Sequence, residues 1–359
     1  TVSVLYWNIS NHMASPAQTV EDSPYTMKEQ DKNAKKLKPT IKSYVNEGFL
    51  NSHDARIIRI LCEFQEPAQR LNKHRVKGTV LLFGSARAMS RTDFEATLAN
   101  IESQLLVADT DEKRGALTEK IAGFKRLEWM CKWVDYSEEL ARMITEWAMT
   151  SEKLKRIMSK LPDYLDVCSL SDDVAVQPLV VTTGGGPGLM EAANRGAASV
   201  PGAKTMGMGI SLPFEKGLNP YVSDGLEFEF HYFFTRKFWM MYSARALIIA
   251  PGGFGTMDEL FELLTLRQTK KIPDLPIVLF CSHFWKSVIN WQALADFGTV
   301  SQKEIDSLCF ADTPEEALIF IQEHFHALES PEQIPPSPQA HPTRSAQSVP
   351  SPMKPGSIQ

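Results

Sequence analysis

One stretch, residues 250–259 (APGGFGTMDE), constrains the fold of this 359-residue chain more than any other. An apolar strand over 246–250 is predicted to run into it, and a helix from Asp258 to about Lys270 is predicted to leave it. Glycines let the backbone bend sharply and approach a ligand, because no Cβ intervenes. This order of elements points backbone N–H groups and a helix N-terminus at an anion. Glu259 is expected in the first turn of the helix, where the helix dipole stabilises a carboxylate.

A second glycine turn, residues 183–188 (TGGGPG), follows another apolar strand, over 179–182. Pro187 suits the first turn of a helix that is predicted to continue through Ala198. The turn has the residue count of neither the dinucleotide motif GxGxxG nor the P-loop GxxxxGK[ST], so these two interpretations fail. Two glycine turns at the carboxyl ends of apolar strands indicate one crevice at a topological switch point of a parallel sheet.

The alternation of apolar strands and amphipathic helices predicts an α/β fold with a doubly wound, Rossmann-like, mostly parallel sheet. Its first strand is expected over 79–83, followed at once by the small-residue turn 84–87 (GSAR). Residues 92–165 are predicted to be helical almost throughout, which is long for one crossover and indicates a helix-rich insertion. Further strands are expected over 206–212, 226–230, 276–281 and 308–311.

The composition of the chain changes along its length and predicts four segments. Residues 1–38 are polar and are interpreted as a flexible N-terminal arm. Residues 39–75 form a helical extension, in which Pro67 is expected to end or kink a helix. Residues 76–328 form a Rossmann-like nucleotide-binding catalytic domain that carries the insertion at about 92–165. Residues 329–359, rich in Pro, Ser and Gln, are interpreted as a disordered tail.

Charge and cysteine content exclude several classes of protein. A net charge of −5 and a pI near 6.0 provide no overall field that attracts nucleic acid or an anionic membrane. No apolar run approaches the roughly 18–20 residues that span a bilayer. The five cysteines are odd in number and lack CxxC spacing, which favours a reducing, cytoplasmic location over a disulfide framework. Neither the cysteines nor the eight histidines cluster, so no metal site is predicted.

A helix predicted over 232–244 carries the adjacent bases Arg236 and Lys237. Neighbouring residues lie about 100° apart around a helix, so at most one of the two points at a given ligand atom. Their surroundings are aromatic, and a charge in an apolar environment needs a partner. This favours a functional Arg236. Three tryptophans of the insertion are interpreted as core or interface residues and not as stacking platforms: Trp129, Trp133 and Trp147.

The two glycine stretches resemble those of a known family. Residues 251–259 fit the signature PGGxGTxxE and residues 184–188 fit the accompanying turn GGGxG of the LONELY GUY (LOG) family, whose members were long mislabelled lysine decarboxylases. The chain resembles the longer members of this family over roughly residues 45–328. The resemblance implies a phosphoribohydrolase, which cleaves the N-glycosidic bond of a nucleoside 5′-monophosphate to free base and ribose 5-phosphate. AMP, or an N6-modified AMP such as a cytokinin riboside monophosphate, is the implied substrate.

The resemblance also implies roles for individual residues. By motif match, Arg236 and Glu259 correspond to the catalytic residues of the family. The chain departs from the family in its insertion and in both tails, which concerns oligomeric state and base preference more than the reaction. Substrate-binding or phosphate-binding roles are implied for Gly185, Gly186, Glu215, Lys237, Gly252, Gly253, Phe254, Gly255, Thr256, Met257, Asp258 and Thr265.

The chemistry of these residue types agrees with such a reaction. Breaking an N-riboside builds positive charge on the sugar, as in other glycoside hydrolyses, and an ionised carboxylate near C1′ can stabilise that charge or activate water. Glu259 is expected to stay ionised near the helix N-terminus. Arg236 would contact this glutamate, the sugar hydroxyls or the phosphate, three options that the sequence leaves open. The scheme needs no metal or organic cofactor, whereas a lysine decarboxylase needs a Schiff-base lysine with pyridoxal phosphate.

An alternative of a different class is a non-hydrolytic binding or carrier protein for a phosphorylated ligand that uses the same crevice. The presence of both Arg236 and Glu259 argues against it, because a pure binder needs no carboxylate beside an anion site. The predicted partners are the nucleoside monophosphate and further copies of the chain, in a homodimer or higher homo-oligomer. Neither nucleic acid nor a membrane is a predicted partner.

Overall fold

The computed structural model describes residues 40–161, 177–212 and 217–328. The chain divides into two compact units, residues 1–51 and 52–359. In the described part of the first unit, a short 3-10 helix, η1 (Ser43–Val45), precedes α1 (Glu47–Leu50). The predicted arm (1–38) and tail (329–359) lie outside the described residues, so both stay predictions.

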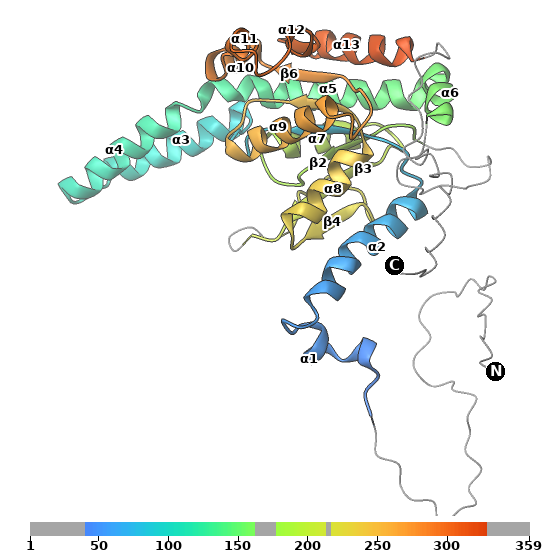
Figure 1. Cartoon of the computed structure of the whole chain (residues 1–359). Coiled ribbons are helices and arrows are strands. Elements are labelled where there is room, and N and C mark those ends of the chain that lie inside the picture. The colour runs from blue at the N-terminus through green and yellow to red at the C-terminus, as the bar shows by residue number, and fades with distance from the viewer. Residues whose placement is uncertain (1–39, 162–176, 213–216, 329–359) are drawn as a thin grey trace, which may run out of the picture. The chain divides into compact units, whose positions relative to one another are not determined.

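The second unit is built on a seven-stranded sheet with the order β4-β3-β2-β1-β5-β6-β7 (Figure 1). Every neighbouring pair of strands runs parallel. The order reverses direction between β1 and β5, which makes this point the topological switch point. The predicted α/β, doubly wound, Rossmann-like fold is therefore confirmed. The strands are β1 (Thr79–Phe83), β2 (Val180–Thr183), β3 (Thr205–Ile210), β4 (Glu227–Phe230), β5 (Ala244–Ile249), β6 (Ile277–Phe280) and β7 (Leu308–Ala311).

Helices cover both faces of the sheet. One face packs against α2 (Arg56–His74), α8 (Phe233–Ser243), α9 (Phe254–Gln268) and the short helices α10 (Ser282–Val288), α11 (Trp291–Asp296) and α12 (Gln302–Asp306). The other face packs against α5 (Cys131–Thr150), α6 (Glu152–Lys160), α7 (Leu189–Ala198) and α13 (Pro314–Ala327). The C-terminal helix thus returns to the layer that contains α5.

The central strands are apolar because both of their faces are covered. Successive side chains of a strand point to opposite faces. In β1, Val80 and Leu82 enter the core cluster beneath α5 and α7, whereas Leu81 and Phe83 enter the cluster beneath α8 and α9. A continuous apolar run is what a strand buried on both sides requires. The pattern that identified β1 in the sequence therefore has a direct structural cause.

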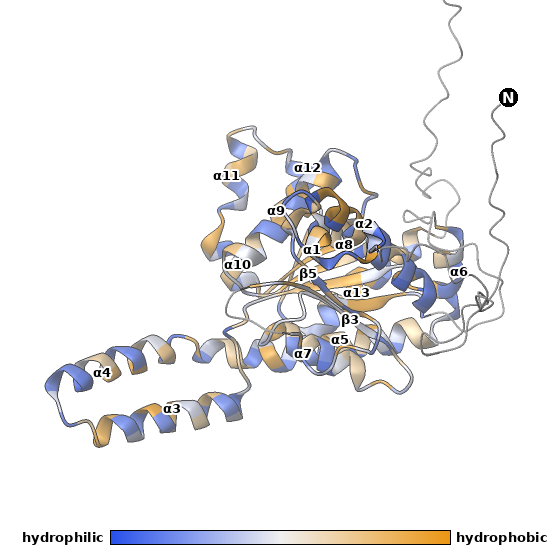
Figure 2. Ribbon diagram, turned by 90° about the horizontal axis from the view of Figure 1, so that it is seen from below, coloured by the Kyte–Doolittle hydropathy of each residue, from blue (hydrophilic) through white to orange (hydrophobic). Residues whose placement is uncertain are grey.

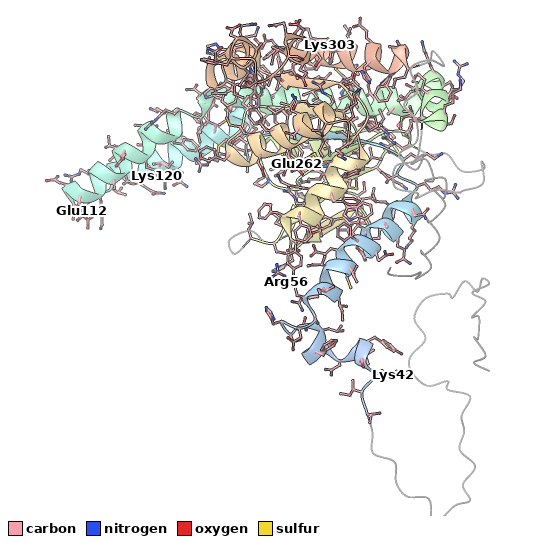
Figure 3. The ribbon with its side chains drawn as sticks, viewed as in Figure 1. Lys42, Arg56, Glu112, Lys120, Glu262 and Lys303 are labelled. Atoms are coloured by element: carbon pink, nitrogen blue, oxygen red, sulfur yellow. The ribbon has the colours of Figure 1, made fainter. Side chains whose placement is uncertain are left out.

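The region from β1 to β2 contains a projecting hairpin. Helices α3 (Arg91–Leu106) and α4 (Asp111–Lys125) lie side by side and extend away from the sheet (Figures 1 and 2). The rings of Phe94 and Phe124 stack with their centroids 4.8 Å apart. The following 3-10 helix η2 (Glu128–Met130) leads into α5, which packs closely on α7. Among the described residues of the predicted insertion, the α3–α4 hairpin, with Glu112 and Lys120 on α4, projects (Figure 3), whereas α5 packs against one face of the sheet.

Pro67 lies inside α2, and this helix continues to His74. Of the two predicted effects of Pro67, an end or a kink, the structure therefore excludes the end, and the kink stays a prediction. A proline lacks the N–H that would bond to the carbonyl four residues earlier, which here belongs to Glu63. That carbonyl instead accepts a hydrogen bond from Trp239 Nε1 on α8, at 2.8 Å. The tertiary contact satisfies the carbonyl that the proline leaves without a partner.

Several apolar side chains remain on the surface of this unit. Ile57 and Leu61 of α2 and Phe233 and Phe234 of α8 are each more than half exposed. Such exposure agrees with the predicted homodimer or higher homo-oligomer, which stays a prediction. Across the described ranges, no helix is both long enough and apolar enough to cross a membrane.

Candidate active site

A cleft of about 670 Å³ opens at the carboxyl ends of β1 and β5. This is the switch point of the sheet, where ligands bind in open α/β folds. Its volume lies in the range of about 300–1,000 Å³ that is typical of small-molecule sites. The lining residues are Phe83 to Arg87, Leu127, Trp129, Met130, Met190, Phe233, Arg236, Pro251 to Thr256, Asp258, Glu259 and Phe284.

The turn after β5 presents the N-terminus of α9 to this cleft. The helix begins at Phe254, with Gly253 as its N-cap, and no side chain caps it. The first N–H groups of a helix have no partner within the helix, and its first turn carries no acidic side chain. Phe254, Gly255 and Thr256 line the cleft. Free N–H groups and the positive end of the dipole suit an anion at this point.

The start of α9 differs from the prediction. The glycines of the motif are typical of a turn, so the sequence indicates a helix from Asp258. In the structure Gly253 is the N-cap and Gly255 is accommodated in the first turn. Since the helix starts at Phe254, Glu259 is its sixth residue and lies in the second turn. The dipole effect falls off within the first turn, so it does not govern the ionisation of Glu259.

Glu259 is the most enclosed carboxylate of the cleft, with 3% of the residue exposed. Its Oε1 lies 3.1 Å from Arg236 Nη1. Its Oε2 is buried and has no hydrogen-bond partner among the described residues. Burial raises the pKa of Glu259, and the nearby positive charges of Arg236 and Lys237 oppose this rise. The helix end therefore does not set the pKa of Glu259, because burial raises this pKa by more than the neighbouring charges lower it.

Arg236 comes from α8 and is held on two sides. Its Nε donates to the carbonyl of Met208 on β3 at 2.7 Å, and its Nη1 donates to Glu259. Burial lowers the pKa of Arg236, against the attraction of Glu259 and Asp258. A Cβ on Gly184 would lie 2.8 Å from Arg236 Nη2, so the second glycine turn leaves room for the guanidinium. Of the three options that the sequence leaves open, the structure shows the contact with Glu259.

Lys237 pairs with two carboxylates of α9 other than the one that Arg236 contacts. Its Nζ lies 2.7 Å from Asp258 Oδ2 and 2.6 Å from Glu262 Oε2. Asp258 lines the cleft, whereas Lys237 does not. The lysine thus ties α8 to α9 beside the Arg236–Glu259 pair. Its predicted contact with the nucleotide stays a prediction.

The three glycines of the first motif have different surroundings. A Cβ on Gly252 would lie 2.1 Å from the hydroxyl of Thr256. A Cβ on Gly253 or Gly255 would meet no atom within 4 Å. Gly252 is therefore required by packing within the protein. Gly253 and Gly255 instead keep open the space above the helix N-terminus, where the predicted phosphate would lie.

We expect Gly253→Ala to fold normally and to weaken the binding of inorganic phosphate. The Gly253 φ of −92° is accessible to alanine, but the methyl group would project toward the anion. Losing one hydrogen bond to a charged group corresponds to about 10-fold to 100-fold in affinity. Isothermal titration calorimetry measures this loss. The contrasting variant Gly252→Ala should instead lower the free energy of unfolding by about 1–3 kcal/mol, because its Cβ clashes with Thr256. Unchanged phosphate affinity in Gly253→Ala would contradict the assignment.

The second glycine turn is closed by a buried polar network. Thr183 donates to Asn194 Oδ1 at 2.6 Å, and Asn219 donates to the same oxygen at 2.9 Å. Asn219 also donates to the carbonyls of Gly185 and Gly186, both at 3.2 Å. Neither glycine lines the cleft. Their predicted phosphate contact stays a prediction, and their carbonyls belong to the polar network around Asn219.

We expect Asn194→Ala to lower the free energy of unfolding by about 3 kcal/mol. Asn194 is fully buried, and its amide nitrogen donates to Thr205 Oγ1 at 2.6 Å and to the Met206 carbonyl at 3.2 Å. Each buried polar group that loses its partner costs about 1–3 kcal/mol. Urea unfolding measures the change. The exposed Asn100→Ala variant of α3 serves as a control, and equal stability of the two variants would contradict the role of the network.

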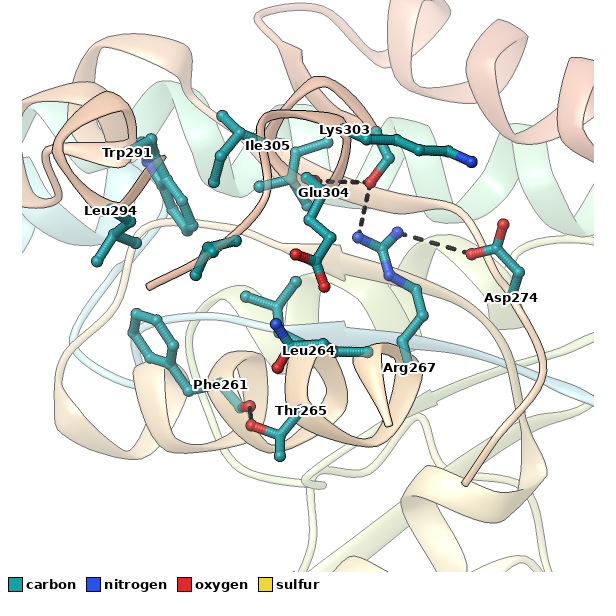
Figure 4. Close-up of a pocket in the computed structure, with 14 residues that line it drawn as sticks. Phe261, Leu264, Thr265, Arg267, Asp274, Trp291, Leu294, Lys303, Glu304 and Ile305 are labelled. Carbon is teal, nitrogen blue, oxygen red and sulfur yellow. Dashed lines mark hydrogen bonds and ion pairs between the residues drawn. The ribbon is translucent and has the colours of Figure 1, made fainter. Parts of the chain in front are cut away.

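Other predicted residues lie elsewhere. Met257 packs against the apolar core of the sheet, and Glu215 lies outside the described residues. Thr265 lines a separate pocket of about 300 Å³, where its hydroxyl donates to the Phe261 carbonyl at 2.8 Å (Figure 4). Figure 4 also shows Arg267 reaching toward Asp274 in this pocket. The predicted nucleotide contacts of Met257, Glu215 and Thr265 stay predictions.

The cleft includes residues that the sequence did not single out as site residues. Ser85 lies between the two glycine turns, because its N–H donates to the Pro251 carbonyl and its carbonyl accepts from Leu189. Trp129 is 45% exposed and stacks on Phe284, with ring centroids 5.8 Å apart. Of its two predicted roles, core or interface, this exposure excludes the core and leaves the interface role a prediction, whereas Trp133 is buried as predicted. The small-residue turn directly after the first strand could have indicated Ser85 as a cleft residue. No sequence pattern distinguished Trp129 from the other tryptophans of the insertion.

Comparisons with known proteins agree with the sequence motifs. A family described as possible lysine decarboxylase matches residues 190–321. No curated protein matches the chain significantly. Among solved structures, the molybdenum cofactor binding protein from the phototrophic bacterium Rippkaea orientalis is 15% identical, with a TM-score of 0.35 over 68% of this chain and 94% of that chain. This last likeness supports no inference about function. The family match over residues 190–321, which includes the glycine motif at 251–259, is consistent with the LOG family, formerly called possible lysine decarboxylases.

Proposed function

We propose that this protein hydrolyses the N-glycosidic bond of a nucleoside 5′-monophosphate, with AMP or an N6-modified AMP as substrate. The family match over residues 190–321 supports a nucleotide-processing role at the level of the family. The observation that carries the proposal is the buried Glu259 Oε2, which has no hydrogen-bond partner within the described residues and belongs to the lining of the cleft. A buried acceptor without a partner is costly unless a ligand or water satisfies it.

The geometry supports two separate roles within the cleft, phosphate binding at the N-terminus of α9 and bond cleavage at Glu259. The N-terminus of α9 would bind the 5′-phosphate through the N–H groups of Phe254, Gly255 and Thr256. This remote anchor fixes the position of the ribose relative to the carboxylate. Glu259 lies further along the same helix, paired with Arg236. Glu259 Oε2 would then face the sugar ring or the attacking water.

The proposed step balances without a further reactant. The bond from C1′ to the base nitrogen breaks, and its electron pair leaves with the base. The water oxygen bonds to C1′, one of its protons is taken up through Glu259, and the base nitrogen gains a proton. Positive charge develops on the sugar in between. An ionised Glu259 stabilises that charge electrostatically and can accept the proton of the water.

The alternative is a binding or carrier protein that uses the same cleft without cleavage. Both functions predict binding of a monophosphate, so binding alone does not distinguish them. Purified full-length protein should be incubated with AMP and N6-isopentenyl AMP, and with adenosine as a control that lacks the phosphate. Release of free base and ribose 5-phosphate from a monophosphate, but not from adenosine, is the expected result. Tight binding of both monophosphates without release would establish the carrier function instead.

A further inference from the structure

Helix α8, which carries Arg236, begins without a cap of its own. Its N-cap is Tyr232, whose side chain makes no capping hydrogen bond, and its first turn contains no acidic residue. The N–H groups at a helix start need partners from outside the helix. Arg236 lies directly above this start, since its own N–H bonds to the Tyr232 carbonyl at 3.2 Å. Any fraying of the first turn would therefore move the guanidinium.

Contacts that fix this helix start come from Glu63 of α2, more than 160 residues earlier in the sequence. Glu63 Oε1 accepts a hydrogen bond from the His231 N–H at 2.8 Å. Glu63 Oε2 accepts from the Tyr232 N–H at 3.4 Å and from the Thr235 hydroxyl at 2.5 Å. A carboxylate at a helix N-terminus also interacts favourably with the helix dipole. One side chain of α2 thus binds the two residues that precede α8 and Thr235 in its first turn.

Two further contacts fix the same pair of helices. Trp239 donates from Nε1 to the backbone carbonyl of Glu63, the carbonyl that Pro67 leaves without a helical partner. The ring of Phe64 meets the ring of Phe238 edge-on, with centroids 5.1 Å apart. The Glu63 region therefore contacts α8 on both sides of Arg236. Arg236 in turn reaches across to Glu259 on α9 and to the Met208 carbonyl on β3.

We propose that Glu63 is a positioning residue of the active site, which acts through the first turn of α8 to hold Arg236 against Glu259. This inference rests on the proposed function and deepens it, because it makes a helix preceding the first strand part of the catalytic apparatus. Glu63 does not line the cleft and so does not act on the substrate directly. Its effect on the reaction must pass through Arg236.

The test compares Glu63→Ala, Glu63→Asp and the control Glu66→Ala. Glu66 lies one turn further along α2, is exposed and pairs with the half-buried Arg70, so its removal changes the charge of α2 equally. Misplacement of a catalytic group by about 1 Å can reduce the rate about 100-fold. We expect Glu63→Ala to lower kcat for AMP by about 10-fold to 100-fold with little change in KM. Glu63→Asp should recover part of this loss, and Glu66→Ala should behave as the wild type.

The pH profile separates a positioning role from a purely structural one. If Arg236 moves away, Glu259 loses its nearest positive charge, and the acid limb of kcat/KM shifts to higher pH. A second change at Arg236 should abolish this effect. The double variant Glu63→Ala with Arg236→Met should therefore match Arg236→Met alone. An unshifted acid limb in Glu63→Ala, or additive losses in the double variant, would overturn the proposal.

Failure of the proposed function can be told apart from failure of this inference. If the wild type releases base from no monophosphate, the pH dependence of unfolding still reports the protonation of Glu259. The relevant quantity is the difference in unfolding free energy between the wild type and Glu259→Gln across pH, measured with and without Glu63→Ala. In the Glu63→Ala background, we expect this difference in unfolding free energy to change up to a higher pH than in the wild-type background, because Glu259 then stays protonated to higher pH. Identical profiles in both backgrounds would overturn the positioning role without reference to catalysis.

Discussion

Glu259→Gln is expected to reduce kcat for AMP by about 1,000-fold or more while leaving the fold intact. Glutamine keeps the shape and the hydrogen bond to Arg236, but it can neither carry the negative charge that stabilises the sugar cation nor accept the proton of water. Loss of a preorganised electrostatic contact costs about 100-fold to 1,000-fold, and loss of a general base a further 100-fold or more. Release of ribose 5-phosphate at saturating AMP measures the effect.

Two controls make this result specific to Glu259. The variant should bind ribose 5-phosphate with nearly wild-type affinity, because the N-terminus of α9 is unchanged. Asp258→Asn, one residue earlier, removes a carboxylate that also lines the cleft but pairs with Lys237, and we expect a smaller loss. Full activity of Glu259→Gln would mean that another group provides the negative charge, and the proposed mechanism would fail.

The same variant should remove a dependence of stability on pH. The pKa of Glu259 is raised in the folded protein, so the folded state holds this proton more tightly than the unfolded state. The contribution of Glu259 to the free energy of unfolding therefore falls as pH rises from the ordinary glutamate pKa through the raised value. Glu259→Gln cannot titrate, and its urea-derived stability should lack this decline.

Arg236→Met is expected to lower kcat/KM by about 100-fold or more and to move the acid limb of the pH profile upward. Methionine fills much of the space but removes the charge that lowers the pKa of Glu259. Burial then raises the pKa of Glu259 without the opposing charge of Arg236. Glu259 therefore stays protonated to higher pH, and a larger fraction of the enzyme is inactive near neutrality. Initial rates between pH 5 and about 9 report both the loss and the shift.

Stability measurements provide the control for Arg236→Met. Removing one member of a buried ion pair costs about 3–5 kcal/mol, because the other charge is left without a partner. The double variant with Glu259→Gln should recover much of that loss, since no buried charge remains. A wild-type acid limb in Arg236→Met, with the loss of stability present, would show that Arg236 contributes to packing and not to the ionisation of Glu259.

Much of the architecture follows from local pattern. Short apolar runs ending in small residues predicted β1, β2 and β5, and the structure places them side by side at the centre of the sheet. Strands buried on both faces have to be apolar along their whole length, so their signal is strong. The turns after these strands are correspondingly well predicted. The cleft at their carboxyl ends follows from the parallel arrangement itself.

The start of helix α9, the pKa of Glu259 and the position of Trp129 followed less well from the sequence. The glycines of residues 252–255 indicate a turn, yet the helix begins among them, which places Glu259 one turn deeper than expected. The pKa of Glu259 depends on how much protein surrounds it, and no local pattern reports that. Trp129 faces the cleft because the chain returns from the α3–α4 hairpin at this point. Long-range placement decided all three features.

The sequence by itself determined the parallel sheet, the two glycine turns and the pair of residues, Arg236 and Glu259, that the site contains. Only the tertiary structure decided what each of them contacts. Lys237 pairs with Asp258 and Glu262, the second glycine turn leaves room for the guanidinium of Arg236, and Glu63 binds the start of α8 from another helix. Local patterns arise from interactions over a few residues, whereas burial and ion pairing depend on segments that meet only after folding.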